Sequence, residues 1–396
     1  MKFTTPKTRI RIRRLSKVFK MKKIKIFTVV GTRPEIIKLS EVIKALDRET
    51  DHILVHTGQN YDYELNEIFF KDLGLRKPDY FLNAAGAGFV ETAANAILKI
   101  DPVLAKEEPD AFLILGDTNS CLAAYAAKRR KIPIFHMEAG NRCFDERVPE
   151  EINRRVVDHI SDVNLVYSEH ARRHLLREGL PPELVIKTGS PMYEVISVHR
   201  ERAESSKILE ELGLKPMEYF VLSSHREENI DNEKNFNRFL ETIKRLSERY
   251  RMRIVFSVHP RTRKRIDEKG VIFPDNVLAL KPLGFLDYIK LQKNAFCVLS
   301  DSGTINEEAS ILNFPAVNIR ETHERHEAID EAATVMSGLD PERVLQAVEV
   351  VIKQGRLNDR TIRLVSDYGS PNVSEKVMRI ILSYTDYVNS KIWRKV

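Results

Sequence analysis

The stretch KIKIFTVVGTRPEIIKLSEVIKALDRETDHILVHTG, residues 23–58, contains the unit from which the rest of the chain is built. Ile24–Val30 and His52–His56 are short, apolar and rich in β-branched residues, which is typical of buried strands. Between them, Glu35–Leu46 has apolar residues at the spacing of an amphipathic helix. Strands that alternate with helices in this way predict a parallel sheet with helices on both faces.

The same alternation continues along the chain and restarts once, after Gly213 and Pro216. Before the restart, we expect the strands Ala111–Leu115, Pro133–Met137, Val163–Tyr167 and Val185–Lys187, the helix Ala123–Arg130 and a helix-rich stretch, Val195–Leu212. After it, we expect the strands Tyr219–Ser223, Arg253–Val258, Val277–Leu280, Cys297–Ser300 and Ala316–Ile319 and the helix Asn235–Tyr250. This pattern predicts an α/β fold with two Rossmann-like, doubly wound domains that face a cleft, at 21–190 and 191–372, and a final helix at 373–396 that packs back on the first domain.

The positive charge of the chain is concentrated at its beginning. The formal net charge is +7, but residues 1–20 carry eight basic residues and no acidic one, and the remainder has 56 basic against 57 acidic side chains. A nearly neutral body lacks the basic surface of a nucleic-acid-binding domain. Two interpretations remain for 1–20: a disordered extension before a natural start at Met21, or a basic tail that meets acidic lipid or nucleic acid.

Composition also argues against several classes of protein. No apolar run approaches the roughly 18 residues that span a bilayer, and residues 1–20 lack the apolar core of a secretory signal. Three widely spaced cysteines, Cys121, Cys143 and Cys297, argue against a disulfide framework and fit a reducing compartment. We therefore expect a cytoplasmic enzyme with no membrane partner.

The first polar turn, Gly31-Thr32-Arg33-Pro34-Glu35, is a candidate anion site. Gly31 permits a sharp turn after the strand, and the free N–H groups at a helix start favour a phosphate or a carboxylate. Arg33 and Lys38 add full positive charges beside them. The alternative is an ordinary turn with solvated charges. The absence of a GxGxxG pattern argues against a dinucleotide site.

Carboxylates follow two strands of the first half and begin a later helix. Asp117 follows an apolar strand, Glu138 ends the next one, and Glu150 and Glu151 lie at a helix start. Because these positions converge at one edge of a sheet, we expect like charges to raise one another's pKa and to hold a proton for acid/base work. The alternatives are a helix cap for Asp117 and a plain helix-start preference for the Glu pair.

Polar residues also follow strands of the second half. In Ser223-Ser224-His225-Arg226, the histidine can donate to a leaving phosphate or move a proton, although a structural role is the alternative, and His259 is a weaker candidate. Near the last strands, Ser302, Gly303 and Thr304 offer N–H and hydroxyl donors to a pyrophosphate, and Glu308 can accept from sugar hydroxyls. A charged loop follows at 320–327. No histidine lies at a recognised metal-ligand spacing, which predicts no metal site; the histidines considered are His136, His225, His259, His323 and His326.

Together these segments resemble the non-hydrolysing UDP-N-acetylglucosamine 2-epimerase family. The matching motifs occur in the family's order from about Met21 to Asp330; they are GTRPEIIK, HTGQNYD (56–62), LGDTNS, HMEAGNR, PEEINR, TGSP, SSHREEN, DSGTINEEA and the loop at 320–327. The resemblance implies two Rossmann-like domains arranged as in B-type glycosyltransferases, and no cofactor. It also implies C2 epimerisation of a UDP-2-acetamido sugar, by anti elimination of UDP and re-addition to a 2-acetamidoglycal.

Two segments are most similar to one subgroup of that family. They are HMEAGNRCFDERVPEEINRRVVDHISD, residues 136–162, and SSHREEN. The subgroup converts UDP-2-acetamido-2,6-dideoxy-L-talose to UDP-N-acetyl-L-fucosamine for capsule and O-antigen synthesis. Members that act on UDP-GlcNAc usually carry a longer stretch before PEE, and a UDP-GlcNAc/UDP-ManNAc 2-epimerase is the alternative. One departure from the family is Arg325-His326-Glu327-Ala328 in place of ERPE, with His at the Pro position.

Carried over position by position, the resemblance implies two groups of site residues. Asp117, Glu138 and Glu150 are the implied acid/base groups at C2, with His225 assisting UDP departure. The implied substrate and UDP ligands are Arg33, Lys38, Tyr288, Ser302, Gly303, Thr304, Glu308 and Arg325, with Tyr288 lining the uracil pocket. The family also implies a homodimer and raises UDP-GlcNAc as a candidate allosteric effector.

Three other functions compete with this one. A B-type UDP-sugar glycosyltransferase shares the fold and the UDP site, but the carboxylate cluster and the lack of an acceptor site or a membrane-facing helix argue against it. A hydrolysing epimerase that releases free N-acetylmannosamine is chemically close. A non-catalytic nucleotide-sugar-binding protein has no need of the acidic residues.

Overall fold

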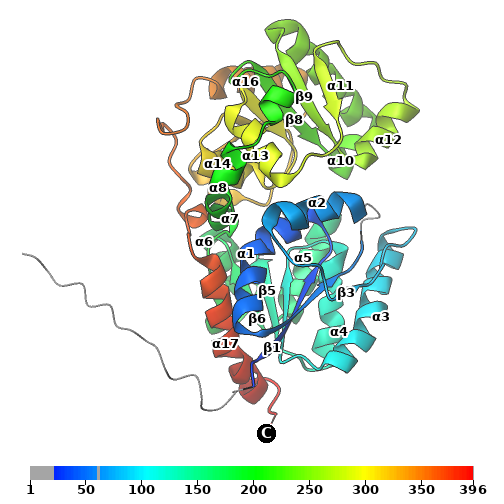
Figure 1. The fold of residues 1–396 in the computed structure, drawn as a ribbon, viewed down its shortest axis with the longest axis vertical. Coiled ribbons are helices and arrows are strands. Elements are labelled where there is room, and N and C mark those ends of the chain that lie inside the picture. The colour runs from blue at the N-terminus through cyan, green and yellow to red at the C-terminus, as the bar shows by residue number, and fades with distance from the viewer. Residues whose placement is uncertain (1–21, 60–62, 396) are drawn as a thin grey trace, which may run out of the picture.

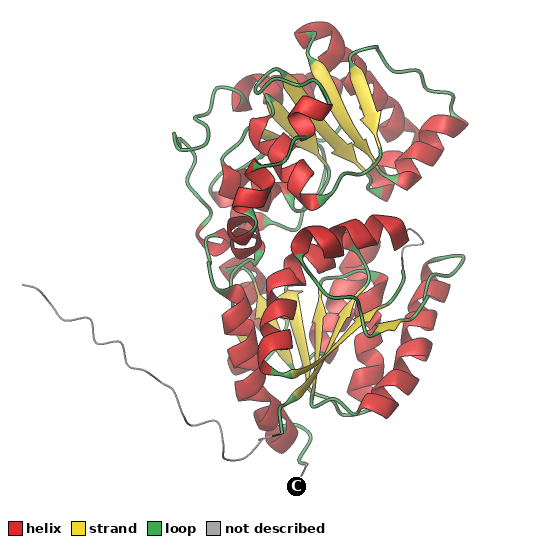
Figure 2. Ribbon diagram, in the orientation of Figure 1, coloured by secondary structure: helices red, strands yellow, loops and turns green. Residues whose placement is uncertain are grey.

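The computed structural model describes residues 22–59 and 63–395 and contains two parallel β-sheets with helices on both faces (Figures 1 and 2). One sheet lies in the lower half of Figure 1 and the other in the upper half. The segment 1–20 and part of the HTGQNYD motif, residues 60–62, lie outside the described residues. The predicted class, α/β with two doubly wound units, is confirmed.

The first sheet has seven parallel strands in the order β3-β2-β1-β4-β5-β6-β7. Their bounds are β1 Lys25–Val30, β2 Asp51–His56, β3 Tyr80–Phe81, β4 Ala111–Leu115, β5 Ile134–Ala139, β6 Val163–Val166 and β7 Val185–Lys187. The strand order reverses between β1 and β4, and such a switch point is where open α/β sheets bind ligands. The loops at Gly31 and Asp117 therefore follow neighbouring strands.

The second sheet has six parallel strands in the order β10-β9-β8-β11-β12-β13. Their bounds are β8 Tyr219–Ser224, β9 Arg253–Val258, β10 Val277–Leu280, β11 Cys297–Ser300, β12 Ala316–Asn318 and β13 Val335–Met336. The switch point lies between β8 and β11. His225 and Asp301, which directly follow these two strands, are thereby brought side by side.

The helices connect the strands in chain order. Up to the end of the first sheet they are α1 Arg33–Glu49, α2 Tyr63–Leu73, α3 Phe89–Glu107, η1 Asn119–Ala123, α4 Ala124–Arg129, α5 Pro149–Ile160, α6 Glu169–Arg177 and η2 Pro182–Leu184. After it they are α7 Met192–Val198, α8 Arg200–Glu204, α9 Ile208–Glu211, α10 Glu227–Ile230, α11 Glu233–Tyr250, α12 Pro260–Glu268, α13 Phe285–Asn294, α14 Ile305–Leu312, α15 His326–Asp330, α16 Pro341–Val351, η3 Ser366–Tyr368 and α17 Val373–Lys391.

The structure differs from the sequence-based expectations at a few element ends. β5 continues past Met137 to Ala139, with a shift of register at Glu138. β3 and β13 escape prediction, because a two-residue edge strand has no measurable periodicity. The helix-rich stretch expected at 195–212 consists of three short helices, α7, α8 and α9.

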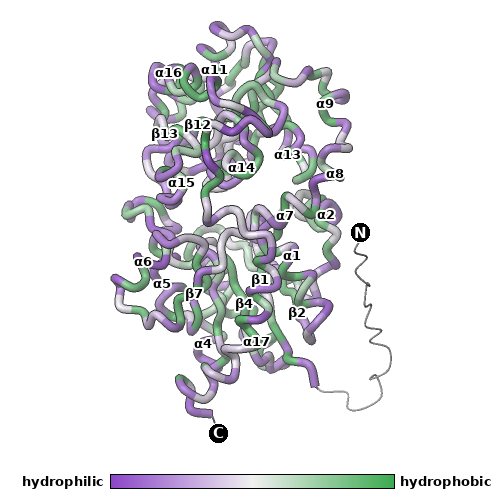
Figure 3. Tube along the Cα trace, turned by 90° about the vertical axis from the view of Figure 1, so that its left-hand side faces the viewer, coloured by the Kyte–Doolittle hydropathy of each residue, from purple (hydrophilic) through white to green (hydrophobic). Residues whose placement is uncertain are grey.

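Helix α17 follows the second sheet in sequence but packs with the first (Figure 1). Its residues Val377, Ile381 and Val388 are buried in one apolar cluster with Leu39 and Val42 of α1. Figure 3 shows the more hydrophobic segments inside the two units and the hydrophilic ones on the outer loops and helices. Among the described helices, none is both long and apolar enough to cross a membrane.

Candidate active site

Loops at the carboxyl ends of both sheets supply the charged and polar residues of the site. In the first unit these loops follow β1, β4 and β5, and in the second they follow β8, β9, β11 and β12. Ion pairs join the first unit to the second: Lys38 lies 3.6 Å from Glu307, and Arg154 lies 3.9 Å from Glu324. The two sheet edges therefore face one another across a single site.

A pocket between the units is lined by residues from both. Its apolar wall includes Phe69 of α2 and Phe285 of α13. It brings together eight residues singled out from the sequence, namely Arg33, Lys38, His225, His259, Tyr288, Ser302, Thr304 and Glu308. Five others lie outside its lining, namely Asp117, Glu138, Glu150, Gly303 and Arg325.

The start of α1 differs from the expected anion site. Glu35 Oε2 accepts hydrogen bonds from the N–H groups of Gly31, at 2.5 Å, and Thr32, at 3.1 Å. The chain's own carboxylate therefore takes these two N–H groups, which precede the helix, and the anion site at the helix start stays a prediction. The positive charge at this wall comes instead from the side chains of Arg33 and Lys38.

Lys38 and Arg325 hold Glu138 between the two units. Lys38 Nζ donates to Glu138 Oε2 at 2.7 Å and lies 3.6 Å from Glu307. Arg325 donates to the other oxygen of Glu138 and lies 3.4 Å from Glu307. Both cations lie over the ring of Tyr167, at 5.7 and 5.5 Å from its centroid. Two cations and two carboxylates thus form one buried cluster across the cleft.

Glu138 combines an unusual backbone with an unusual charge state. Its φ is +66°, in the left-handed region, at the point where the register of β5 and β6 shifts. Such a conformation costs roughly 1–3 kcal/mol in a non-glycine residue and is concentrated at functional sites. Burial acts to raise the pKa of Glu138, but Lys38 and Arg325 lower it to about 2. The expectation of a raised pKa is thus wrong for Glu138, because its cationic partners outweigh its acidic neighbours.

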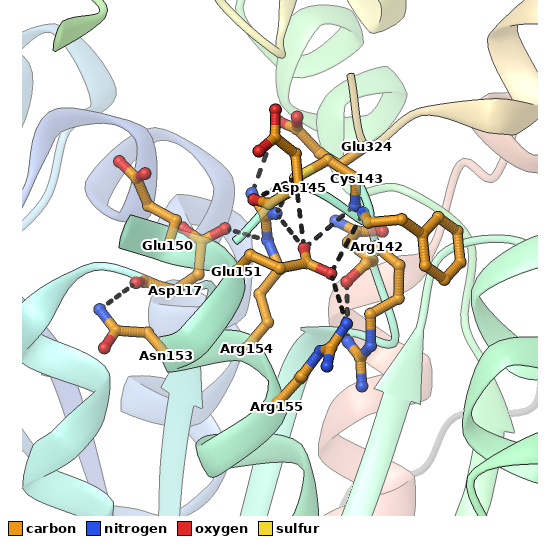
Figure 4. Close-up of polar contacts among 12 residues, drawn as sticks. Asp117, Arg142, Cys143, Asp145, Glu150, Glu151, Asn153, Arg154, Arg155 and Glu324 are labelled. Atoms are coloured by element: carbon orange, nitrogen blue, oxygen red, sulfur yellow. Dashed lines mark hydrogen bonds and ion pairs between the residues drawn. The ribbon is translucent and has the colours of Figure 1, made fainter. Parts of the chain in front are cut away.

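Asp117 belongs to a second cluster, centred on Arg154 (Figure 4). Arg154 Nε donates to Asp117 Oδ2 at 2.7 Å, and its Nη1 donates to Glu151 at 2.9 Å. Burial raises the pKa of Asp117, and the charges of Glu150 and Glu138 act in the same direction against Arg154. A raised pKa, expected for the whole cluster, is therefore found at Asp117.

The helix-cap alternative does not apply to Asp117. The next residue, Thr118, accepts a hydrogen bond from the N–H of Ser120 and caps η1. The Asp117 side chain is instead committed to Arg154, while its backbone carbonyl accepts from Asn153 at 2.8 Å. Both contacts come from α5, so this helix fixes the position of the carboxylate.

The two glutamates at the start of α5 have different surroundings. Glu151 is fully buried and accepts from the N–H groups of Cys143, at 3.0 Å, and Phe144, at 3.3 Å. It therefore holds the loop that precedes the helix. Glu150 is partly exposed and lies 3.4 Å from Arg226 of the second unit. Glu150 is the member of the pair that faces the other side of the cleft.

Four charged residues that join the units escape the sequence analysis: Arg154, Arg226, Glu307 and Glu324. Glu324 lies 3.6 Å from Arg226 and 3.9 Å from Arg154. Burial acts to raise the pKa of Glu324, but Arg320, Arg154 and Arg226 hold it well below its usual range. All four residues belong to recognised motifs, yet nothing in a run of charges indicates which member will be buried.

His225 and His259 lie together at the second unit's wall of the pocket. Their ring centroids are 5.7 Å apart. Burial lowers the pKa of His259 to about 3, and the charges of His225 and Arg33 act in the same direction. His259 is therefore neutral at pH 7. The Nδ1 atom of His225 lies 3.2 Å from Oδ1 of Asp301, a buried residue directly after β11.

The loop between β11 and α14 supplies hydroxyl groups to the same wall. The hydroxyls of Ser302 and Thr304 lie 3.0 Å apart and line the pocket. A Cβ atom at Gly303 would lie 2.6 Å from a carboxylate oxygen of Glu324. A larger residue at this position would therefore require the Glu324 side chain to move.

Glu308 and Tyr288 complete the pocket. Gln292 donates to Glu308 at 2.6 Å. Burial raises the pKa of Glu308 to about 7, although this hydrogen bond acts to lower it. Both charge states are therefore populated near neutral pH. The hydroxyl of Tyr288 donates to Ser223 at 3.2 Å, which fixes the ring against the pocket.

The loop at 320–327 places His326 in a group of four imidazoles. Its ring centroid lies 5.3 Å from that of His323, 5.5 Å from His174 and 6.2 Å from His170. His170 and His174 belong to α6, so the group bridges the two units. Burial lowers the pKa of His326 to about 4, and the other three rings act in the same direction. Within 22–59 and 63–395, no group of three or more His, Cys, Asp and Glu is arranged to hold a metal ion.

The chain is similar to known proteins over most of its length. The family model of UDP-N-acetylglucosamine 2-epimerase matches residues 44–382. A solved structure of UDP-N-acetylglucosamine 2-epimerase from Rickettsia bellii is 53% identical, with a TM-score of 0.88, over 94% of this chain and 100% of that one. The Methanocaldococcus jannaschii UDP-GlcNAc 2-epimerase, solved in complex with UDP-GlcNAc and UDP, is 34% identical, with a TM-score of 0.85, over 91% and 100%. A UDP-2,3-diacetamido-2,3-dideoxy-D-glucuronate 2-epimerase from Pseudomonas aeruginosa is 33% identical over 89% of this chain and 98% of that protein.

Proposed function

Because the chain belongs to the UDP-N-acetylglucosamine 2-epimerase family, we propose that it catalyses C2 epimerisation of a UDP-2-acetamido sugar. The observation that carries this proposal is the position of Lys38, which lines the pocket and also donates to Glu138. One side chain thereby links an anion pocket to a buried carboxylate. The proposed route is anti elimination of UDP to a 2-acetamidoglycal, followed by re-addition of UDP to the sugar inverted at C2.

UDP is proposed to occupy the pocket between α1 and the loop after β11. Arg33 brings positive charge to the pyrophosphate, and the hydroxyls of Ser302 and Thr304 donate from the other wall. Glu308 is proposed to accept from the ribose hydroxyls, and Tyr288 to line the uracil pocket. The full set of proposed ligands is Arg33, Lys38, Tyr288, Ser302, Gly303, Thr304, Glu308 and Arg325.

Epimerisation needs groups on both faces of C2, because the proton leaves from one face and returns to the other. Burial raises the pKa of Asp117, whereas cations lower the pKa of Glu138 to about 2. Carboxylates with separated pKa values can serve as acid and base in one site. We assign Glu138 to proton removal and Asp117 to proton return in one direction, with the roles exchanged in the other. Glu150 is the third proposed member of this acid/base group.

Substrate binding is expected to make Glu138 a stronger base. Lys38 lines the pocket, so a pyrophosphate attracts the ammonium group that now bonds Glu138. When this interaction weakens, the ammonium group of Lys38 stabilises the carboxylate less. Burial then raises the pKa of Glu138. In the free enzyme Glu138 is therefore ionised but weakly basic. Binding of the substrate makes it more basic.

Loss of UDP from C1 requires stabilisation of the negative charge that develops on the departing phosphate. Fixed donors in a water-poor site do this most effectively. His225 is proposed to assist this departure, with Arg33 and the hydroxyls of Ser302 and Thr304 sharing the charge. All four side chains line the same pocket.

For the sugar, we propose UDP-2-acetamido-2,6-dideoxy-L-talose, with UDP-N-acetyl-L-fucosamine as the product used in capsule or O-antigen synthesis. The short segment between Glu138 and Pro149 and the SSHREEN motif support this choice. A UDP-GlcNAc/UDP-ManNAc 2-epimerase is the alternative, and the names of the R. bellii and M. jannaschii proteins favour it. The P. aeruginosa relative is named for a third UDP-sugar. A homodimer and activation by UDP-GlcNAc are further proposals from the resemblance.

The proposal is tested by incubation with each UDP-sugar in deuterated water, followed by NMR. Deuterium at C2 together with an epimerised UDP-sugar supports it, and the sugar that reacts identifies the substrate. Release of free sugar favours a hydrolysing epimerase. Absence of exchange with every candidate sugar contradicts the proposal.

A further inference from the structure

We propose that Asp301 is a positioning residue that keeps the proton of His225 on Nδ1, so that His225 meets the departing UDP through Nε2. The inference rests on the proposed function and deepens it. Asp301 is fully buried and lies outside the pocket lining, whereas His225 lines the pocket. Any effect of Asp301 on the reaction therefore passes through its neighbours.

The two oxygens of Asp301 share the N–H of His225 and otherwise have different partners. Oδ2 accepts from the Ser224 hydroxyl at 2.6 Å, from the Asn229 amide at 3.1 Å and from the N–H of Arg226 at 3.1 Å. The N–H of His225 donates to both oxygens, at 3.0 Å to Oδ2 and 3.1 Å to Oδ1, and only Oδ1 lies close to the ring, 3.2 Å from Nδ1. Four residues between the end of β8 and α10 thereby donate to one carboxylate, which lies beside Nδ1 of the imidazole.

The carboxylate of Asp301 is ionised. Burial acts to raise the pKa of Asp301, but the imidazole of His225 and hydrogen bonds from Ser224 and the Arg226 amide hold it well below its usual range. An ionised carboxylate only accepts hydrogen bonds, so the neighbouring Nδ1 must carry the hydrogen. Since Nδ1 faces Asp301, Nε2 is the ring nitrogen left for the pocket.

In this arrangement one proton moves between His225 and the β-phosphate oxygen as UDP departs and returns. When the C1–O bond breaks, its electron pair stays on the β-phosphate oxygen. The imidazolium form of His225 gives the Nε2 proton to that oxygen, while Asp301 stabilises the positive charge through Nδ1–H. On re-addition the oxygen attacks C1 and the proton returns to Nε2. No oxidant, reductant or further reactant is required.

The chain provides a matched control for this pair. His52 Nδ1 lies 2.6 Å from Asp47 Oδ1, in a pair that also involves Arg76. Neither His52 nor Asp47 lines the pocket. The variant Asp47→Asn thus removes an equivalent charge from a histidine that has no part in the proposed reaction.

The first test is the tautomer of His225 in the wild-type protein, measured by ¹⁵N NMR of the histidine rings with His225→Gln to assign the signals. We expect Nδ1 protonated in the free protein, and a shift of the Nε2 signal when UDP is added. A ring protonated only on Nε2 overturns the proposal. Because this measurement needs no turnover and no Asp301 variant, it decides the point even where Asp301→Asn fails to fold.

The second test is the kinetics of Asp301→Asn and Asp301→Glu. For Asp301→Asn we expect kcat to fall by roughly 100-fold or more, the usual range for a general acid, with KM changed less than about threefold. Asp301→Glu, which keeps the charge, recovers part of kcat, and Asp47→Asn retains it. Equal kcat in Asp301→Asn and wild type, or a loss confined to KM, overturns the proposal. If the wild type turns over no UDP-sugar, the epimerase proposal fails, while an Nδ1–H signal still upholds the Asp301–His225 arrangement.

Discussion

The two sides of the cleft each bury an ionised carboxylate, but they hold it by different means. Asp301 of the second unit is surrounded by a hydroxyl, an amide, backbone N–H groups and an imidazole, all from the same unit. Glu138 of the first unit is held by two cations, Lys38 and Arg325, and the second of these comes from across the cleft. One carboxylate is fixed by its own unit, and the other depends on the unit opposite.

This difference indicates how the site divides its tasks. Groups that stay in place suit the binding and departure of UDP, since fixed dipoles need no rearrangement as charge develops. A carboxylate held by cations can change its basicity when those cations find a better partner. We therefore expect variants of Glu138 and Asp117 to affect proton transfer at C2, and variants on the second side to affect the binding or the departure of UDP.

The largest effect is expected from Glu138→Gln and Asp117→Asn. Each removes an ionisable group from the proposed proton path, which typically costs about 10²- to 10⁴-fold in kcat. Binding of UDP, measured by calorimetry, is expected to stay within about threefold of wild type because neither side chain lines the pocket.

A matched control is Glu178→Gln, which alters a carboxylate bonded to Arg142 outside the pocket. Near-normal turnover in both Glu138→Gln and Asp117→Asn would show that the acid/base assignment is wrong. Loss of UDP binding in either variant would remove the distinction between the two sides.

The next largest effect is expected from Glu324→Gln. Its carboxylate is buried among Arg320, Arg154 and Arg226, and loss of that charge leaves three cations close together. We expect about 3 kcal/mol less free energy of unfolding, the scale for breaking a buried ion pair. Urea unfolding measures this difference. Glu342→Gln, at an exposed pair with Arg245, is expected to change stability by less than about 1 kcal/mol, and similar losses in both variants would contradict the account.

A smaller effect is expected from Glu308→Gln, on the second side of the cleft. The amide keeps one acceptor but loses the charge, so the Kd for UDP is expected to rise roughly 10-fold, equivalent to about 1.4 kcal/mol. The variant also removes the group whose pKa burial raises to about 7. We therefore expect the Kd of the variant for UDP to stay constant across neutral pH, where the Kd of the wild type changes. An unchanged Kd and pH profile would argue that Glu308 does not meet the nucleotide.

The smallest effect is expected from the imidazoles around His326. The pKa of His326 is about 4 in the folded protein, below its ordinary value near 6.5. Between these pH values the unfolded chain binds a proton that the folded protein does not, so stability falls as pH falls from about 6.5 to about 4. Because the ring is only half buried, we expect about 1 kcal/mol. The variant His326→Asn should flatten this part of the stability curve, and an unchanged slope would contradict the assignment.

The fold can be predicted because segments with the apolar spacing of strands alternate along the sequence with segments that have the spacing of helices. Tertiary packing does not change these assignments. The polar loops were predictable for a related reason: in a parallel sheet, every loop that follows a strand opens on the same edge. Thus Arg33, His225 and Ser302, from three separate segments, could be assigned to one site before their geometry was known.

The charge states could not be predicted in the same way. Glu35 turns back onto its own helix start, Glu151 holds a loop and Glu138 lies between two cations, although all three appear in the sequence as acidic residues near a strand or helix end. The role of Asp301 cannot be predicted from the sequence, because only the tertiary structure shows that its carboxylate accepts hydrogen bonds from Ser224 and Arg226. The burial and partners of a charge depend on contacts between segments distant in sequence.

The most direct test of the central claim follows the C1–O bond itself. A UDP-sugar is prepared with ¹⁸O in the bridge between C1 and the β-phosphate and is incubated with the enzyme. Elimination and re-addition allow the phosphate to rotate before it returns, so we predict that ¹⁸O moves from the bridge into the non-bridging positions, as seen by ³¹P NMR. Epimerised product with all of its ¹⁸O still in the bridge would contradict cleavage of the C1–O bond, and with it the proposed division of the cleft.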